Sequence, residues 1–141
     1  MKNYLNFIKE QLSIKNINLE EFKNEVIDDG NLYGYHVTSK RNLKSIMKIG
    51  LETRIPEDYG TDGDKKGVYL FKTLEDTQTA LYQWLGERIE DIEEETGIEY
   101  NEIILKVNLS GLEKYLSSDV EFEWCCSVNI EASRIIEVYQ E

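Results

Sequence analysis

The stretch LYGYHVTSKRNLKSIMKIGL, residues 32–51, joins a strand pattern to a helix pattern and decides how the middle of the chain folds. Residues 32–37 are predicted to form a strand that carries the only histidine, His36. Ser39 is placed to cap a following amphipathic helix, and Gly50 fits the left-handed position that closes it. A histidine at this point either packs in a core strand or holds a ligand where the strand ends.

The residues before this stretch carry a helical pattern. Apolar positions spaced three and four apart predict two helices, the second introduced by the cap pair Asn18 and Glu21. The pair Asp29 and Gly30 then marks a turn. We therefore divide the chain into an N-terminal helical segment, residues 1–30, and a main domain, residues 31–141, which together form one compact unit.

The segment after the opening stretch begins as a charged, glycine-containing loop, residues 52–66, of a length that is often functional. The sequence GVYLF, residues 67–71, predicts a short strand. Thr73 and Asp76 have the spacing of a capping box, and they predict one long helix that ends at Gly97. The acidic residues on the outer face of that helix are typical of a solvated surface.

The last third of the chain is rich in strand signals. Residues 101–109 and 133–141 each predict a strand, and residues 120–130 predict one or two more. Residues 112–116 fit a single helical turn. Helices and strands alternate without regular βα repeats, so we expect an α+β domain with a largely antiparallel sheet.

Composition limits the function. The chain has 141 residues and a formal net charge of -12, which suits one domain and disfavours nonspecific binding to nucleic acid or to an anionic membrane. The N-terminus does not resemble a signal peptide, and no run approaches the ~20 apolar residues of a membrane span. We therefore expect a cytoplasmic protein with no membrane partner.

The two cysteines, Cys125 and Cys126, are adjacent in the sequence. Neighbouring residues in a strand point to opposite faces, so these two do not form an ordinary disulfide. One is expected to be buried and the other half-exposed. With a single histidine in the chain, no zinc ligand set is recognisable, and we expect no metal.

The succession YHVTS, NLKSIMKIGL and GVYLF, followed by a carboxylate-bearing strand, resembles the ADP-ribosyltransferase fold. The branch it is similar to includes the poly(ADP-ribose) polymerases and the diphtheria-like toxins. The resemblance covers roughly residues 32–138 and implies a split, largely antiparallel sheet with flanking helices. It also implies NAD as the substrate.

The resemblance implies roles for individual residues. His36 matches the family histidine, which hydrogen-bonds the adenosine ribose or the nicotinamide side of NAD. Tyr69 matches the tyrosine whose ring stacks on nicotinamide, and Thr38 would orient His36 or contact a ribose. Arg41 and Arg54, with Lys72, are candidates for the pyrophosphate.

The catalytic carboxylate of the family falls in EFEWCC, residues 121–126. Glu121 and Glu123 repeat every second residue, so both are expected on one strand face. We favour Glu123, which would hold the ribose 2'-hydroxyl and stabilise positive charge as nicotinamide leaves. The alternative for each residue is structural: His36 and Tyr69 would pack in strands, and Glu123 would face solvent.

Three functions follow from these patterns. The leading one is a mono-ADP-ribosyltransferase that uses NAD to modify a protein, in preference to nucleic acid. The main alternative is a catalytically silent module of the same fold that binds an NAD-like nucleotide or a partner protein. A third, an acidic decoy for a basic nucleic-acid-binding surface, is based on charge alone.

Overall fold

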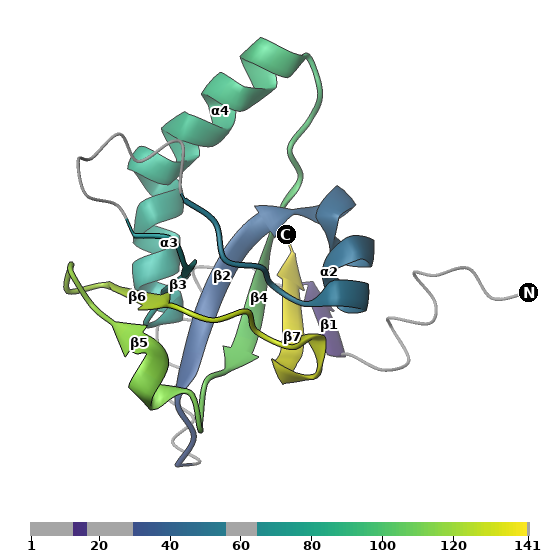
Figure 1. Cartoon of the computed structure of the whole chain (residues 1–141). Coiled ribbons are helices and arrows are strands. Elements are labelled where there is room, and N and C mark those ends of the chain that lie inside the picture. Colours follow the sequence, from purple (N-terminus) through teal and green to yellow (C-terminus); the bar gives the residue numbers. More distant parts are fainter. Residues whose placement is uncertain (1–12, 17–29, 56–64, 141) are drawn as a thin grey trace, which may run out of the picture.

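The computed structural model describes residues 13–16, 30–55 and 65–140. Figure 1 shows a twisted sheet with helices on either side. Its strands run in the order β1-β7-β4-β2-β3-β6-β5. They are β1 (Ser13–Asn16), β2 (Tyr33–Ser39), β3 (Val68–Phe71), β4 (Glu102–Asn108), β5 (Leu116–Ser117), β6 (Glu123–Cys126) and β7 (Ile135–Gln140). The domain is therefore α+β, as predicted, and every neighbouring pair of strands is antiparallel except β1 and β7.

The centre of the sheet is β4. Residues 103–107 are all buried, because both faces of this strand are covered. Leu105 packs in the larger core cluster together with Leu43 of helix α2 (Leu43–Ile49). Its neighbour Ile104 points to the other face, where Leu74 of helix α3 (Leu74–Tyr82) packs. The helices therefore lie on opposite faces of the sheet, as Figure 1 also shows.

The sheet is nearly divided between β2 and β3. The strands β2 and β4 pair along seven positions, whereas β2 and β3 pair only at Tyr35 and Phe71. The strands β3 and β6 then pair along four positions. This opening is the structural feature that makes room for the site described below.

The N-terminal segment is only partly described. Its residues 13–16 form a strand, β1, which pairs in parallel with β7. Segment 1–30 was predicted to be helical, but these four residues, which lie between its two predicted helices, form a strand whose backbone groups bond the edge of β7. The predicted helices on either side lie outside the described residues, as do residues 56–64 of the predicted loop.

The predicted single helix of residues 74–97 is two helices. Helix α3 ends at Gln83, where the backbone leaves the helical region (φ -122°, ψ -121°), and helix α4 (Trp84–Thr96) follows. At the break the carbonyl of Leu81 comes so close to Gly86 that a Cβ there would lie 2.0 Å from its oxygen. The predicted ends are correct: the Asp76 amide donates to Thr73 Oγ1 (2.9 Å), and Gly97 is left-handed.

Two smaller predictions need correction. Ser39 precedes a 3-10 turn (Lys40–Asn42), but its hydroxyl does not cap it and donates instead to the Tyr100 carbonyl (2.6 Å). Cys125 and Cys126 are both buried, and neither is half-exposed. Both thiols are free, as expected. No helix among the described residues has the length and apolar character that crossing a bilayer requires.

Candidate functional site

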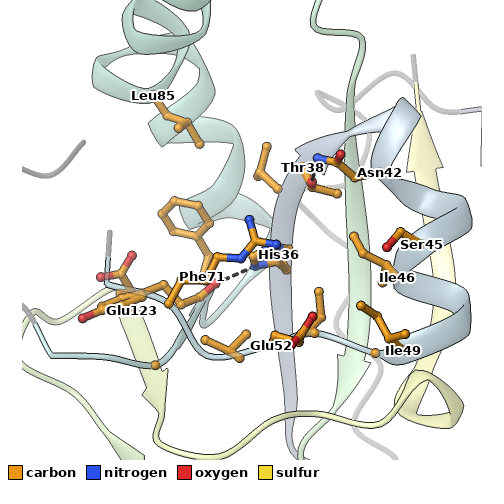
Figure 2. A pocket seen from close by; sticks show the side chains of 17 residues that line it. His36, Thr38, Asn42, Ser45, Ile46, Ile49, Glu52, Phe71, Leu85 and Glu123 are labelled. Atoms are coloured by element: carbon orange, nitrogen blue, oxygen red, sulfur yellow. Dashed lines mark hydrogen bonds between the residues drawn. The ribbon is translucent and has the colours of Figure 1, made fainter. Parts of the chain in front are cut away.

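A cavity of about 270 Å³ opens where β2 and β3 separate, between helix α2 and strand β6. Five of the residues predicted for the site line it: His36, Thr38, Arg54, Tyr69 and Glu123. Figure 2 shows Glu123 on one side of His36 and the residues of α2 on the other. The sequence separation of these residues shows that the fold, and not local sequence, brings them together.

Arg41 is one of two predicted site residues that do not line the cavity. It lies in the exposed 3-10 turn after β2. Lys72, another candidate for the pyrophosphate, places its ammonium 4.3 Å from the centre of the Trp124 ring. This cation–π contact holds Lys72 away from the cavity wall.

His36 owes its position to the opening of the sheet. Its register partner on β4 is the core residue Leu105, so its side chain lies on the α2 face of the sheet. If β2 and β3 continued to pair beyond Tyr35, Tyr69 would face Val37, but the ladder stops there. The Tyr69 carbonyl is therefore not used by β2 and lies 2.8 Å from His36 Nδ1.

The protonation state of His36 follows from these contacts. Burial lowers the pKa of the imidazole; the bond to the Tyr69 carbonyl opposes this effect, and the nearby Arg54 charge adds to it. The ring is therefore neutral at pH 7. Since a carbonyl can only accept, Nδ1 carries the proton and Nε2 is an acceptor.

Tyr69 is half-buried on the cavity wall. Its hydroxyl donates to the carbonyl of Lys65, which fixes the outer end of the side chain. Lys65 in turn forms an exposed ion pair with Asp119 (3.3 Å). The ring is thus held at both ends, by its strand and by the start of the segment before β3.

Glu123 is the first residue of β6 and is half-buried. Its register partner is Phe71, which lines the same cavity, as does Leu85. Phe71 also stacks on Phe122 with ring centres 6.2 Å apart. Glu121 lies in the turn before β6 and is exposed, so the prediction that it shares a strand face with Glu123 is wrong.

Three of the lining residues with polar or charged side chains were not predicted from the sequence: Asn42, Ser45 and Glu52. The Asn42 amide donates to Thr38 Oγ1 (3.1 Å), which joins the end of β2 to the start of α2. Asn42 and Ser45 are three residues apart and so share one helix face. That spacing was a usable signal, because it places two polar residues on a helix that directly follows the histidine strand.

The segment that carries Glu52 and Arg54 is firmly held. Leu51 exchanges two backbone hydrogen bonds with Ile130 (2.8 and 2.9 Å), and Arg54 exchanges two with Gly67 (both 2.9 Å). The Thr53 amide also donates to Asn129 Oδ1 (2.9 Å). The backbone of residues 51–54, which we call the strap, is therefore held in place where it lines the cavity.

Among the described residues, no group of three or more histidine, cysteine, aspartate or glutamate side chains could hold a metal ion. No protein-family model matches the chain, and no curated protein is significantly similar to it in sequence. The function is therefore inferred from the geometry of the cavity and from the chemistry of the side chains that line it.

Proposed function

We propose that this protein is a mono-ADP-ribosyltransferase that uses NAD as its substrate and modifies a protein acceptor. One observation carries the proposal: His36, Tyr69 and Glu123, from three separate strands, line a single cavity. These are the residue types, in the chain order, that the resemblance to ADP-ribosyltransferases implies. The net charge of -12 favours a protein acceptor over nucleic acid.

The cavity fits part of NAD. Its volume of about 270 Å³ is just below the ~300–1,000 Å³ of typical small-molecule sites, so part of the dinucleotide would lie inside and the rest at the opening. The Tyr69 ring would stack on nicotinamide. The acceptor Nε2 of His36 would take a hydrogen bond from a ribose hydroxyl. Arg54, the one cation among the described lining residues, would contact the diphosphate.

Glu123 would supply the electrostatic part of catalysis. In the transfer, the bond between ribose C1' and the nicotinamide nitrogen breaks, and nicotinamide leaves with the electron pair. Positive charge then grows on the ribose until the acceptor nucleophile bonds to C1' and gives up its proton to solvent. A half-buried carboxylate on the cavity wall interacts more strongly with that charge than a carboxylate in bulk water does.

The neutral state of His36 serves the same reaction. The diphosphate of NAD is negative, but the transferred ribose becomes positive, so a protonated imidazole there would oppose the reaction. Burial and Arg54 both lower the pKa of His36 and remove that charge. The hydrogen bond to Tyr69 then aligns the ring.

Incubation with NAD labelled on its adenylate half, with a cell lysate as the acceptor source, tests the proposal. Transfer of label to protein, accompanied by release of nicotinamide, is the expected result. The Glu123→Gln variant controls for chemical glycation by free ADP-ribose, which does not need the enzyme. NAD binding without transfer would favour the silent binding module, and neither binding nor transfer would reject both.

A further inference from the structure

The two sides of the cavity differ in chemistry. On the β6 side, the cavity is lined by Glu123 and by the apolar side chains of Phe71 and Leu85. On the α2 side, the wall combines the neutral polar residues Asn42 and Ser45 with the apolar side chains of Ile46 and Ile49. Figure 2 shows these two groups on either side of His36. If the nicotinamide end of NAD lies at Glu123, its adenosine end extends along α2.

Glu52 stands at the α2 end of this arrangement. In Figure 2 it lies below His36, between Glu123 and Ile49, the last residue of α2. Its backbone is fixed by the hydrogen bonds of Leu51 and Thr53 on either side. Within residues 13–16, 30–55 and 65–140, its side chain makes no hydrogen bond or ion pair, so its charge acts on whatever enters the cavity.

Arg54, two residues from Glu52, is the one cation among the described lining residues. Its charge also lowers the pKa of the His36 imidazole. The remaining charged lining residues of the described chain are the two carboxylates, Glu52 and Glu123. An adenosine end along α2 would therefore meet the Glu52 carboxylate together with polar side chains, Asn42 and Ser45, and apolar ones, Ile46 and Ile49.

We infer that Glu52 is a specificity-determining residue that accepts NAD and rejects NADP. This inference depends on the proposed function, since it assumes a dinucleotide in the cavity. A carboxylate can accept a hydrogen bond from each hydroxyl of an unmodified adenosine ribose, and it repels the phosphate that NADP carries at the 2' position. The site would thus bind dinucleotides without that phosphate.

The test measures the affinities of NAD and NADP by isothermal titration calorimetry for the parent and for two variants. The parent is expected to bind NAD at least about tenfold more tightly than NADP, because like charges brought together are strongly disfavoured. Glu52→Gln removes the charge and should reduce that ratio about tenfold. Glu90→Gln, on the exposed face of α4 outside the cavity, is the matched control and should leave it unchanged.

The outcomes separate this inference from the proposed function. If the parent binds NAD but Glu52→Gln leaves the NAD-to-NADP ratio unchanged, the role of Glu52 is wrong and the transferase proposal is unaffected. If the parent binds NAD and NADP equally, the inference also fails. If the parent binds neither dinucleotide, both proposals fail. Glu52 is exposed, so its variant should fold, and a thermal melt equal to that of the parent checks this.

Discussion

In the proposed reaction, the chemistry depends most on Glu123. This residue is half-buried beside Phe71, and a carboxylate there would stabilise charge that appears only as nicotinamide leaves. Glu123→Gln keeps the shape and removes the charge. We expect the transfer rate to fall about a hundredfold or more, with NAD affinity changed by less than about tenfold, since the lost contact is made mainly in the transition state.

Steady-state assays of nicotinamide release, combined with direct NAD binding, make this measurement. Glu121→Gln is the matched control, because Glu121 carries the same side chain but lies in the exposed turn before β6. It should behave as the parent. Equal loss of activity in both variants would mean that the turn as a whole matters, and a fully active Glu123→Gln would remove this residue from the mechanism.

His36 makes the molecule sensitive to pH. Burial lowers its pKa in the folded state below the ordinary value of 6.5, so between these two values the unfolded chain binds a proton that the folded chain does not. The free energy of unfolding should therefore fall as the pH drops below about 6.5, whereas above that pH this residue adds no pH dependence.

Urea unfolding at several pH values, for the parent and His36→Gln, isolates this contribution from that of the carboxylates. Between pH 7.5 and pH 5.5, conditions chosen at about one unit on either side of the ordinary histidine pKa, the parent should lose more stability than the variant. The single histidine also gives one imidazole to follow by NMR titration. A measured pKa at or above 6.5 would contradict this account of the site.

At the scale of elements, the strap of residues 51–54 depends on Gly50. Its backbone has φ +79°, and a Cβ there would lie 2.2 Å from the Ile130 carbonyl oxygen, which accepts the Leu51 amide. Gly50→Ala should therefore cost about 2–3 kcal/mol of stability, from both strain and a clash with backbone. It should also weaken NAD binding, because the strap carries Glu52 and Arg54.

Gly97→Ala is the control for the strain alone. Gly97 also has positive φ, +69°, but nothing lies within 4 Å of a Cβ there, so the expected cost is about 1–2 kcal/mol. Chemical denaturation of both variants gives the comparison. Equal losses at the two positions would show that the approach of Gly50 to Ile130 is not tight in solution.

The elements that sequence could predict are those with local signals. The strand and helix of residues 33–49, the cap at Thr73 and the close at Gly97 follow from short patterns of apolar, hydroxyl and glycine residues. The break at Gln83 could not be read in this way, because Gln83 and Trp84 suit a helix and the apolar stripe continues past them. The one residue in the sequence that points to this break is Gly86, which leaves room for the Leu81 carbonyl.

At the scale of the whole molecule, the site exists because the sheet opens between β2 and β3. Pairing at a single position, Tyr35 with Phe71, leaves no ladder to close the gap. The local sequence does not show along how many positions two strands will pair. The cavity could therefore not be predicted, although five of the residues that line it were. Glu52 was missed for the same reason: its place depends on the distant partners Ile130 and Asn129 of the strap.

The central claim is that this cavity receives NAD, and NMR of the single His36 imidazole during an NAD titration tests it most directly. The account predicts a saturable shift of the His36 signals. Tyr69→Ala should weaken the affinity by roughly 1–3 kcal/mol through lost stacking, taking base stacking on aromatic residues as the scale. Tyr69→Phe, which keeps the ring and removes the hydroxyl that donates to the Lys65 carbonyl, should bind nearly as the parent does. Signals of His36 that do not move at the highest NAD concentration the sample tolerates would contradict the account.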